Sequence, residues 1–311
     1  IEDISFSVTE SLKRSEAIEN VQPDQTVAIG VGSRGIDRID QVVKATVGYL
    51  KSRGVNPFIV PAMGSHGGAS ASGQRELLGE YGITPEAIGC PIKATMETVE
   101  IGRTESGIPI RIDRIATEAD HVLPINRVKP HTRLTGTIQS GLCKMLMIGL
   151  GNHQGAERFH QAFRQFDYQL DRVAEEIIGK LRSTLPILGW IALVEDAYDQ
   201  LGKVCVVPAS ELLQRDQELL ELAESWLPKL PFDSAELLIV DQIGKEISGT
   251  GMDTNVVGRK WNDKIAGPDE WPKIEEIYVR DLTRKTHGNA AGIGIAEYTH
   301  RRVVDVMDHS K

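Results

Sequence analysis

The chain has 311 residues, of which 41% are hydrophobic and 25% charged, and its net charge at pH 7 is −9. This length allows one large domain or two ordinary domains, each with its own hydrophobic core. The acidic balance and the lack of a basic run argue against a nucleic-acid partner, because phosphate binding relies on clustered lysines and arginines. No apolar stretch reaches the roughly 18 residues that span a bilayer, and the N-terminus lacks a signal-peptide pattern.

The three cysteines, Cys90, Cys143 and Cys205, form neither a Cys-x-x-Cys pair nor an even disulfide framework. This usage is typical of a reducing compartment, so we expect a cytoplasmic protein with no membrane partner. Cys143 could act as a thiolate nucleophile, but its apolar neighbours favour a buried, unreactive thiol.

Short apolar runs alternate with amphipathic stretches in the first half of the chain. Residues 26–31 and 57–61 are predicted strands, and residues 36–53 and 73–81 are predicted helices. This order implies a parallel sheet. A hairpin over 94–113 and a strand over 119–125 follow, and the latter leads into a polar loop.

Helical patterns cover residues 137–150 and 154–181 before the strand patterns return. The expected elements of the second half are strands at 187–195 and 203–208, a helix at 211–226, and strands at 235–240, 274–280 and 302–306. We therefore predict an α/β protein with two α/β domains and mostly parallel sheets. The predicted domains are residues 1–208 and 209–311.

The first motif is the turn from Gly30 to Gly35, which has the form G-x-G-x-x-G after a predicted strand. Such turns are typical of dinucleotide sites, so an NAD-dependent oxidoreductase is one alternative function. That fingerprint needs an acidic residue about 20 positions further on, but none occurs between Asp40 and Glu76. The glycines otherwise serve only a tight turn. Arg34 is a bidentate donor at the carboxyl end of a strand and suits a carboxylate ligand.

The second motif, Gly64-Ser65-His66-Gly67-Gly68, follows the next predicted strand. Its glycines let the backbone approach a ligand, and the helix start behind it offers N–H groups to an anion. No Lys-Ser or Lys-Thr follows, which excludes a P-loop. His66 is therefore either a solvated loop residue or a catalytic imidazole at the carboxyl edge of the sheet.

The densest polar region lies between residues 126 and 160 and contains His131, His153 and His160. Lys144 lies among apolar residues, where desolvation favours the neutral, nucleophilic amine; the alternative is an ordinary surface lysine. His153 and His160 are seven residues apart, so they share one face of a helix and either could bind a borderline metal.

Four patches in this order resemble the nickel-pincer lactate racemases and their homologues. The Gly-Ser-His of His66 is similar to the family's Gly-Thr-His, and Pro130-His131 is similar to its Pro-His. Ser140-Gly141-x-x-Lys144, followed by His160 sixteen residues after the lysine, resembles the cofactor lysine and metal histidine. Gln242-Ile243-Gly244-Lys245 resembles a Gln-x-x-Lys of the second domain. No single patch is specific, but the ordered set is.

The resemblance implies a cofactor derived from nicotinic acid mononucleotide, whose two thio groups hold nickel through sulfur, carbon and sulfur. It implies that Lys144 carries this nickel-pincer nucleotide as a thioamide and that His160 is the fourth nickel ligand. Gly32, Ser33 and Arg34 would then contact the cofactor.

The resemblance also implies an isomerase that racemises or epimerises a 2-hydroxy acid by hydride transfer to and from the cofactor. His66 and His131 would be the acid/base residues on opposite faces of the substrate carbon. Neutral imidazole suits this exchange near neutral pH. Arg34, Gln242 and Lys245 would bind the substrate. The resemblance, with Lys245 in the second domain, also implies an active-site cleft between the two domains.

The sequence departs from the family pattern near the expected substrate. Val31 stands where the family has an aspartate, Asp241 stands where an aromatic residue is expected, and the loop between His131 and Lys144 is longer than in lactate racemase. These differences favour an acid with extra hydroxyl or carboxylate groups over lactate. Three nearby cations would serve such groups: Arg127, Lys129 and Arg133.

A non-catalytic nickel or cofactor carrier is a third possible function, in which the histidines hold metal without turnover. The only partner that the sequence indicates is a small 2-hydroxy acid, and no pattern indicates an oligomeric state.

Overall fold

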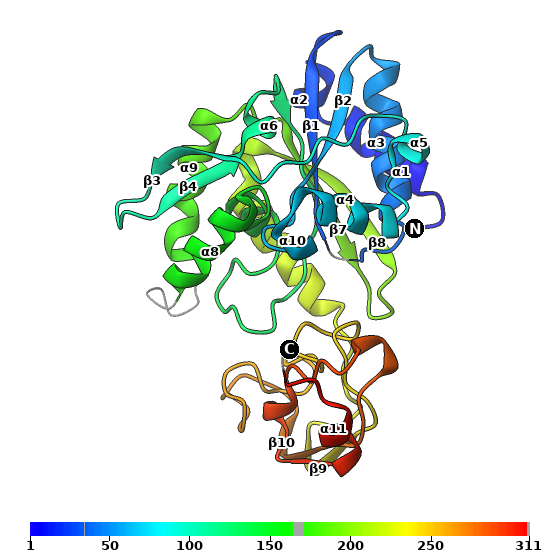
Figure 1. Cartoon of the computed structure of the whole chain (residues 1–311), viewed down its shortest axis with the longest axis vertical. Helices are drawn as coiled ribbons and strands as arrows, with labels where there is room; N and C mark the ends of the chain where they lie inside the picture. The colour runs from blue at the N-terminus through cyan, green and yellow to red at the C-terminus, as the bar shows by residue number, and fades with distance from the viewer. Residues whose placement is uncertain (34, 164–170, 310–311) are drawn as a thin grey trace. The chain divides into compact units, whose positions relative to one another are not determined.

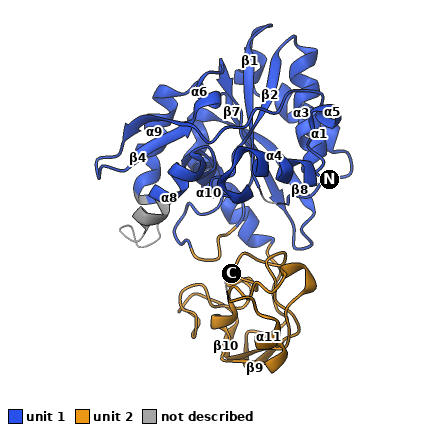
Figure 2. Cartoon of the chain, viewed as in Figure 1, with its two compact units in different colours: residues 1–129, 134–226 blue, residues 130–133, 227–311 orange. Residues whose placement is uncertain are grey.

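The computed structural model describes residues 1–33, 35–163 and 171–309, and the side chains at 159–163 and 172 also lie outside the description. The chain divides into two compact units (Figure 2). Unit 1 contains Ile1–Lys129 and Leu134–Trp226, and unit 2 contains Pro130–Arg133 and Leu227–Lys311.

This division differs from the sequence-based domains in two places. Helix α10 (Leu212–Ser225) was assigned to the second domain, but its buried face belongs to a core cluster of unit 1. His131 was assigned to the N-terminal domain, whereas Pro130–Arg133 makes its contacts in unit 2. Both differences arise from long-range contacts that hydrophobic periodicity does not encode.

Unit 1 is built on a sheet with the strand order β2-β1-β6-β7-β8, in which β5 also pairs with β1. All pairings among these strands are parallel except that between β7 and β8. The strands are β1 (Thr26–Val31), β2 (Asn56–Pro61), β5 (His121–Val122), β6 (Ile125–Arg127), β7 (Gly189–Glu195) and β8 (Leu201–Pro208).

Helices cover both faces of this sheet, as a mostly parallel sheet requires (Figure 1). Side chains alternate along each strand, so Val27, Ile29 and Val31 pack with α1 (Ile4–Lys13) and α3 (Ile39–Ser52). Ala28 faces the other way, into the cluster that contains α9 (Asp171–Thr184) and α10.

The remaining elements of unit 1 are a β-hairpin and several helical segments outside this sheet. A hairpin of β3 (Thr98–Arg103) and β4 (Pro109–Asp113) is antiparallel, as expected. The helical segments are α2 (Glu16–Glu19), η1 (Gly67–Ala69), α4 (Ala71–Glu80), α5 (Pro85–Ile88), α6 (Arg114–Thr117), α7 (Leu142–Lys144), the π-helix η2 (Met145–Gly149), α8 (Asn152–Phe163) and η4 (Ala209–Glu211).

Unit 2 contains a parallel sheet in the order β11-β10-β9, formed by β9 (Ser234–Val240), β10 (Lys273–Val279) and β11 (Tyr298–Thr299). Its helical segments are η5 (Arg284–Thr286), η6 (Ile293–Ile295) and α11 (Arg301–Val306). The strand predicted at 302–306 is wrong, because this segment forms α11. His300 accepts a hydrogen bond from Arg302 N at its start, and Val303 is its buried contact with the core.

The predicted fold class is confirmed: the protein is a mixed α/β protein with a mostly parallel principal sheet. Within the described residues, no helix is long and apolar enough to cross a membrane.

Candidate functional site

The candidate site of unit 1 lies at the carboxyl edge of the sheet, where β1 has β2 on one side and β6 on the other. After β1 the chain continues into α3, which packs on one face of the sheet. After β6 it continues into helices that belong to the core cluster on the opposite face. The loops after β1 and β6 therefore diverge, which is where open α/β sheets bind ligands.

Ser33 and His66 meet at this edge, from the loops after β1 and β2. Ser33 Oγ lies 2.5 Å from His66 Nδ1. Tyr81 donates its hydroxyl to Ser33 O at 2.6 Å, and the buried Gln74 donates to Gly64 O at 3.1 Å, so both loops are held from α4 and its C-terminal cap. Because a hydroxyl can donate or accept, His66 can carry its proton on either ring nitrogen.

Gly67 makes the histidine loop possible. Its φ is +66°, and a Cβ there would lie 2.6 Å from Gln74 N. Only glycine fits both this backbone conformation and this close approach. The glycine-rich sequence around His66 thus positions the imidazole against the start of α4.

Lys144 ends α7 and leads directly into η2, and the five residues of η2 are all buried while Lys144 itself is partly exposed. Short π-helical segments often occur at functional sites. The next residue, Met145, packs so closely on Gly32 that a Cβ at Gly32 would lie 3.1 Å from its Cε. The helix that carries the lysine is therefore in contact with the loop that carries Ser33.

The start of α7 is held by Asp216 of α10 and Asn126 of β6. Asp216 accepts hydrogen bonds from Leu142 N and Cys143 N, both at 3.0 Å. Asn126 donates to Gly141 O at 2.8 Å. Burial raises the pKa of Asp216, although these two N–H groups oppose the shift. The motif Ser140-Gly141-x-x-Lys144 is thus a helix start built around a buried carboxyl group.

Sequence reasoning missed Asp216. A signal was present, because Leu212, Asp216, Leu219 and Leu220 have helical i, i+4, i+7, i+8 spacing and all four are buried. An acidic residue on the apolar stripe of a helix needs buried hydrogen-bond donors.

All three cysteines are free thiols, and the prediction that Cys143 is buried is confirmed. Cys143 is buried, and burial, followed by the neighbouring Asp216, raises its pKa well above the usual value. Burial also raises the pKa of Cys90 to about 11 and that of Cys205. A Cys143 thiolate nucleophile is therefore disfavoured.

We expect slow alkylation of the folded protein by iodoacetamide at pH 8. A thiol of pKa about 11 has roughly 10²-fold less thiolate there than an unfolded cysteine, so Cys90 and Cys143 stay largely unmodified. Peptide mass spectrometry after alkylation with and without urea measures this, and urea should expose all three thiols. Rapid modification of Cys143 in the folded protein would contradict the assignment.

His131 lies in unit 2 and is partly buried. Its Nδ1 accepts a hydrogen bond from Arg133 N at 2.9 Å. The neutral ring therefore carries its proton on Nε2.

The three cations expected to serve an extra substrate group each have a carboxylate partner. Arg127 forms a short ion pair with the buried Glu195, Lys129 lies 3.4 Å from Asp199, and Arg133 pairs with Asp263. Binding of an extra substrate carboxylate by any of these cations would therefore have to replace an existing ion pair.

The other predicted site residues are distributed as follows. Arg34 and the side chain of His160 lie outside the described residues; the backbone of His160 is part of α8, where the side chain of His153 is exposed. Gln242 and Lys245 follow β9 in unit 2, and Lys245 Nζ donates to Gly249 O at 2.6 Å.

The glycine turn after β1 does not have the dinucleotide-binding geometry. Helix α3 begins at Ile39, four residues beyond Gly35, and its N-cap Arg38 is left-handed and makes no side-chain capping bond. In the dinucleotide fingerprint the helix opens within the glycine motif, so that its N-terminus faces the pyrophosphate. This difference weighs against the NAD-dependent alternative.

No cluster of three or more His, Cys, Asp or Glu side chains suited to a metal occurs among the described side chains. A cofactor that brings three donor atoms of its own needs only one protein ligand, so this arrangement is compatible with a pincer. The residues of unit 1 fit such a group, because the partly exposed Lys144 begins an otherwise buried segment packed against the Gly32–Ser33 loop.

Comparison with known sequences assigns the family. The model of the lactate racemase N-terminal domain matches residues 2–169, which is more than half of the chain. The chain therefore belongs to the lactate racemase N-terminal domain family. A search of curated proteins found no match.

Solved structures share the fold. A protein from Thermotoga maritima superposes with a TM-score of 0.64 at 16% identity, covering 89% of this chain and 70% of its own. The lactate racemase apoprotein from Thermoanaerobacterium thermosaccharolyticum superposes with a TM-score of 0.61 at 15% identity, covering 89% of this chain and 67% of its own.

Proposed function

We propose that this protein is a racemase or epimerase that inverts C2 of a 2-hydroxy acid, with a nickel-pincer nucleotide tethered to Lys144 and His160 as the protein ligand of nickel. The observation that carries the proposal is a contact between two segments in a chain of the lactate racemase family. The loop of Gly32 and Ser33, whose hydroxyl lies beside His66, packs against Met145, the residue that follows Lys144. When bound, the cofactor would supply a reversible hydride acceptor.

The chain's own groups would handle the proton and the carboxylate. His66, with its hydroxyl partner, can present a lone pair at Nε2 and accept the proton of the substrate hydroxyl. In its neutral form His131 carries its proton on Nε2 and can donate a hydrogen bond to the substrate oxygen. As an imidazolium it can return a proton to that oxygen. In each direction of the inversion, one histidine is neutral and accepts the hydroxyl proton, while the other is an imidazolium and returns a proton to the oxygen. Arg34, Gln242 and Lys245 are the proposed carboxylate-binding residues.

The test uses protein produced in a host that makes the cofactor. Intact-mass measurement should find an adduct on the wild-type chain and none on Lys144→Ala, because the amine is the attachment point. Nickel analysis should find metal in wild type and His153→Ala but not in His160→Ala, which should keep the adduct. Chiral chromatography of 2-hydroxy acids incubated in D₂O should show inversion with the α-hydrogen retained, as hydride return requires.

Lys203→Ala is the matched control, since Lys203 is an exposed lysine on β8. An unmodified wild-type chain, or an adduct that survives in Lys144→Ala, would refute the tether. Loss of nickel from His153→Ala, but not from His160→Ala, would identify His153 as the nickel ligand. Nickel binding without inversion would identify a carrier, and reduction of added NAD by a hydroxy acid would identify a dehydrogenase.

A further inference from the structure

The residues after His131 are held by a single loop of unit 2. Thr254 donates its hydroxyl to Thr132 O at 2.7 Å. The guanidinium group of Arg133 pairs with Asp263 through a short ion pair. One end of the loop from Thr254 to Asp263 therefore binds Thr132, and the other end binds Arg133. These are the two residues that directly follow the histidine.

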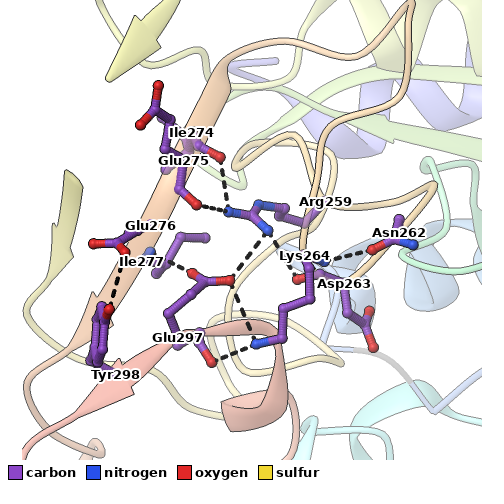
Figure 3. A network of polar contacts seen from close by, with 11 residues as sticks. Arg259, Asn262, Asp263, Lys264, Ile274, Glu275, Glu276, Ile277, Glu297 and Tyr298 are labelled. Carbon is purple, nitrogen blue, oxygen red and sulfur yellow. Dashed lines mark hydrogen bonds and ion pairs between the residues drawn. The ribbon is translucent and has the colours of Figure 1, made fainter. Parts of the chain in front are cut away.

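A buried arginine anchors this loop to the sheet of unit 2. The side chain of Arg259 is 0% exposed. Its Nη2 donates to Ile274 O at 2.8 Å and to Glu275 O at 3.1 Å, while Nη1 donates to Asp263 O at 3.2 Å (Figure 3). The same guanidinium group thus joins the backbone of β10 to the residue that pairs with Arg133.

Glu297 completes the anchor. Its Oε1 lies 3.5 Å from both Arg259 Nη1 and Lys264 Nζ, and its Oε2 accepts from Ile277 N at 2.7 Å (Figure 3). Burying a guanidinium group is costly unless it is paired and hydrogen-bonded. Both terminal nitrogens of Arg259 are hydrogen-bonded while the loop is docked on β10, whereas its buried Nε has no partner. The docked position therefore satisfies most of the guanidinium group.

The loop contacts the residues whose backbone donates to the imidazole. Arg133 N donates to His131 Nδ1 at 2.9 Å, so the backbone of Arg133 contributes to the orientation of the ring and favours the Nε2–H tautomer. Thr254 binds the carbonyl group of the peptide unit whose N–H group is Arg133 N, and Asp263 binds the Arg133 side chain. A displacement of about 1 Å at a reacting group can lower a rate by as much as 10²-fold.

We propose that the loop from Thr254 to Asp263 positions His131, with Asp263 and Arg259 as positioning residues that fix the tautomer of the imidazole through Arg133. The catalytic consequence rests on the proposed racemase function, whereas the structural consequence does not. Unit 2 then contains an oriented hydrogen-bond donor, His131 Nε2, in addition to the proposed substrate-binding residues Gln242 and Lys245 that follow β9.

The test compares Asp263→Asn, Arg133→Gln and the double variant in the full chain. Arg259 is left intact because its loss endangers folding. Nitrogen-15 spectra of histidine-labelled, cofactor-free protein, assigned with His131→Gln, should show a single Nε2–H tautomer in wild type. Each single variant should give a mixture of tautomers at His131. The double variant should give the same mixture, because all three variants lose the same contact, the Arg133–Asp263 ion pair. Melting temperatures should change little, since an exposed ion pair contributes roughly 0–1 kcal/mol.

Asp305→Asn is the matched control, because Asp305 forms an exposed ion pair with Arg301 in the same unit, 3.4 Å apart. It should leave the His131 signals unchanged. In cofactor-loaded protein, kcat for racemisation should fall roughly tenfold in Asp263→Asn with KM unchanged. Unchanged His131 signals in all three variants would overturn the inference whatever the activity. Altered signals in a protein that does not racemise would support the positioning and refute the proposed function.

Discussion

Replacing Gly141 with alanine should destabilise the protein by about 3 kcal/mol, one of the largest effects expected of any single methyl group in this chain. The added Cβ would lie 2.0 Å from Asp216 Oδ1, so the carboxyl group or the helix start must move. Either movement breaks the bonds from Leu142 N and Cys143 N to a buried acceptor. Urea unfolding of the two proteins measures the difference.

Gly79→Ala is the matched control for that experiment. Gly79 lies in α4, is exposed, and has no heavy atom within 4 Å of an added Cβ. Alanine should stabilise the protein there by roughly 0.5–1 kcal/mol, because it has the higher helix propensity and a less flexible unfolded state. The double variant of Gly141→Ala and Asp216→Ala should lose less free energy of unfolding than the two single variants lose together. The steric clash and the broken hydrogen bonds both involve Asp216, so their effects are not additive. Similar free energies of unfolding for Gly141→Ala and Gly79→Ala would contradict this account of the motif.

Loss of either proposed acid/base histidine should have the largest effect on activity. His66→Ala and His131→Ala are each expected to lower the racemisation rate by roughly 10²–10⁴-fold, because each removes the group that exchanges a proton on one face of the substrate. The Lys144 adduct should persist in both variants. Chiral chromatography and intact mass, applied to the same preparations, separate these two properties.

Ser65→Ala is the control for the histidine variants, because Ser65 is an exposed neighbour of His66 in the same loop. It should retain both the adduct and racemisation. Racemisation at the wild-type rate in His66→Ala or in His131→Ala would refute a scheme in which each face has its own acid/base residue. Loss of the adduct together with activity would instead mean that the histidines support cofactor attachment.

The sequence predicted the framework of unit 1 well because its signals are local. Strands β1, β2 and β7 are mostly apolar, β8 is apolar from Val204 to Pro208, and α3 between β1 and β2 has clear amphipathic periodicity. The failure at 302–306 has the same origin. Its valines suggested a strand, but packing of Val303 and the hydrogen bond at His300 produced α11.

The candidate site was predictable only in part. Glycine motifs directly after strands located Ser33 and His66, since the carboxyl ends of parallel strands meet at one edge. Asp216 gave only the signal of an acidic residue on the apolar stripe of a helix, which does not identify its partners. The backbone partners of Asp216 and Arg259 lie 73 and 15 residues away in the sequence. The charges of Arg127 and Arg133 suggested substrate contacts, but whether a surface cation is available depends on its neighbours in space.

The sequence by itself determined the α/β class, the family resemblance and the identities of the candidate residues, because these depend on residue type and spacing along the chain. Only the tertiary structure decided how they are held. It placed His131 with unit 2, capped the helix start of Lys144 with a buried carboxyl group from α10, and paired the cations expected to bind substrate. Those outcomes depend on which distant segments share a buried contact, and residue spacing alone does not specify that.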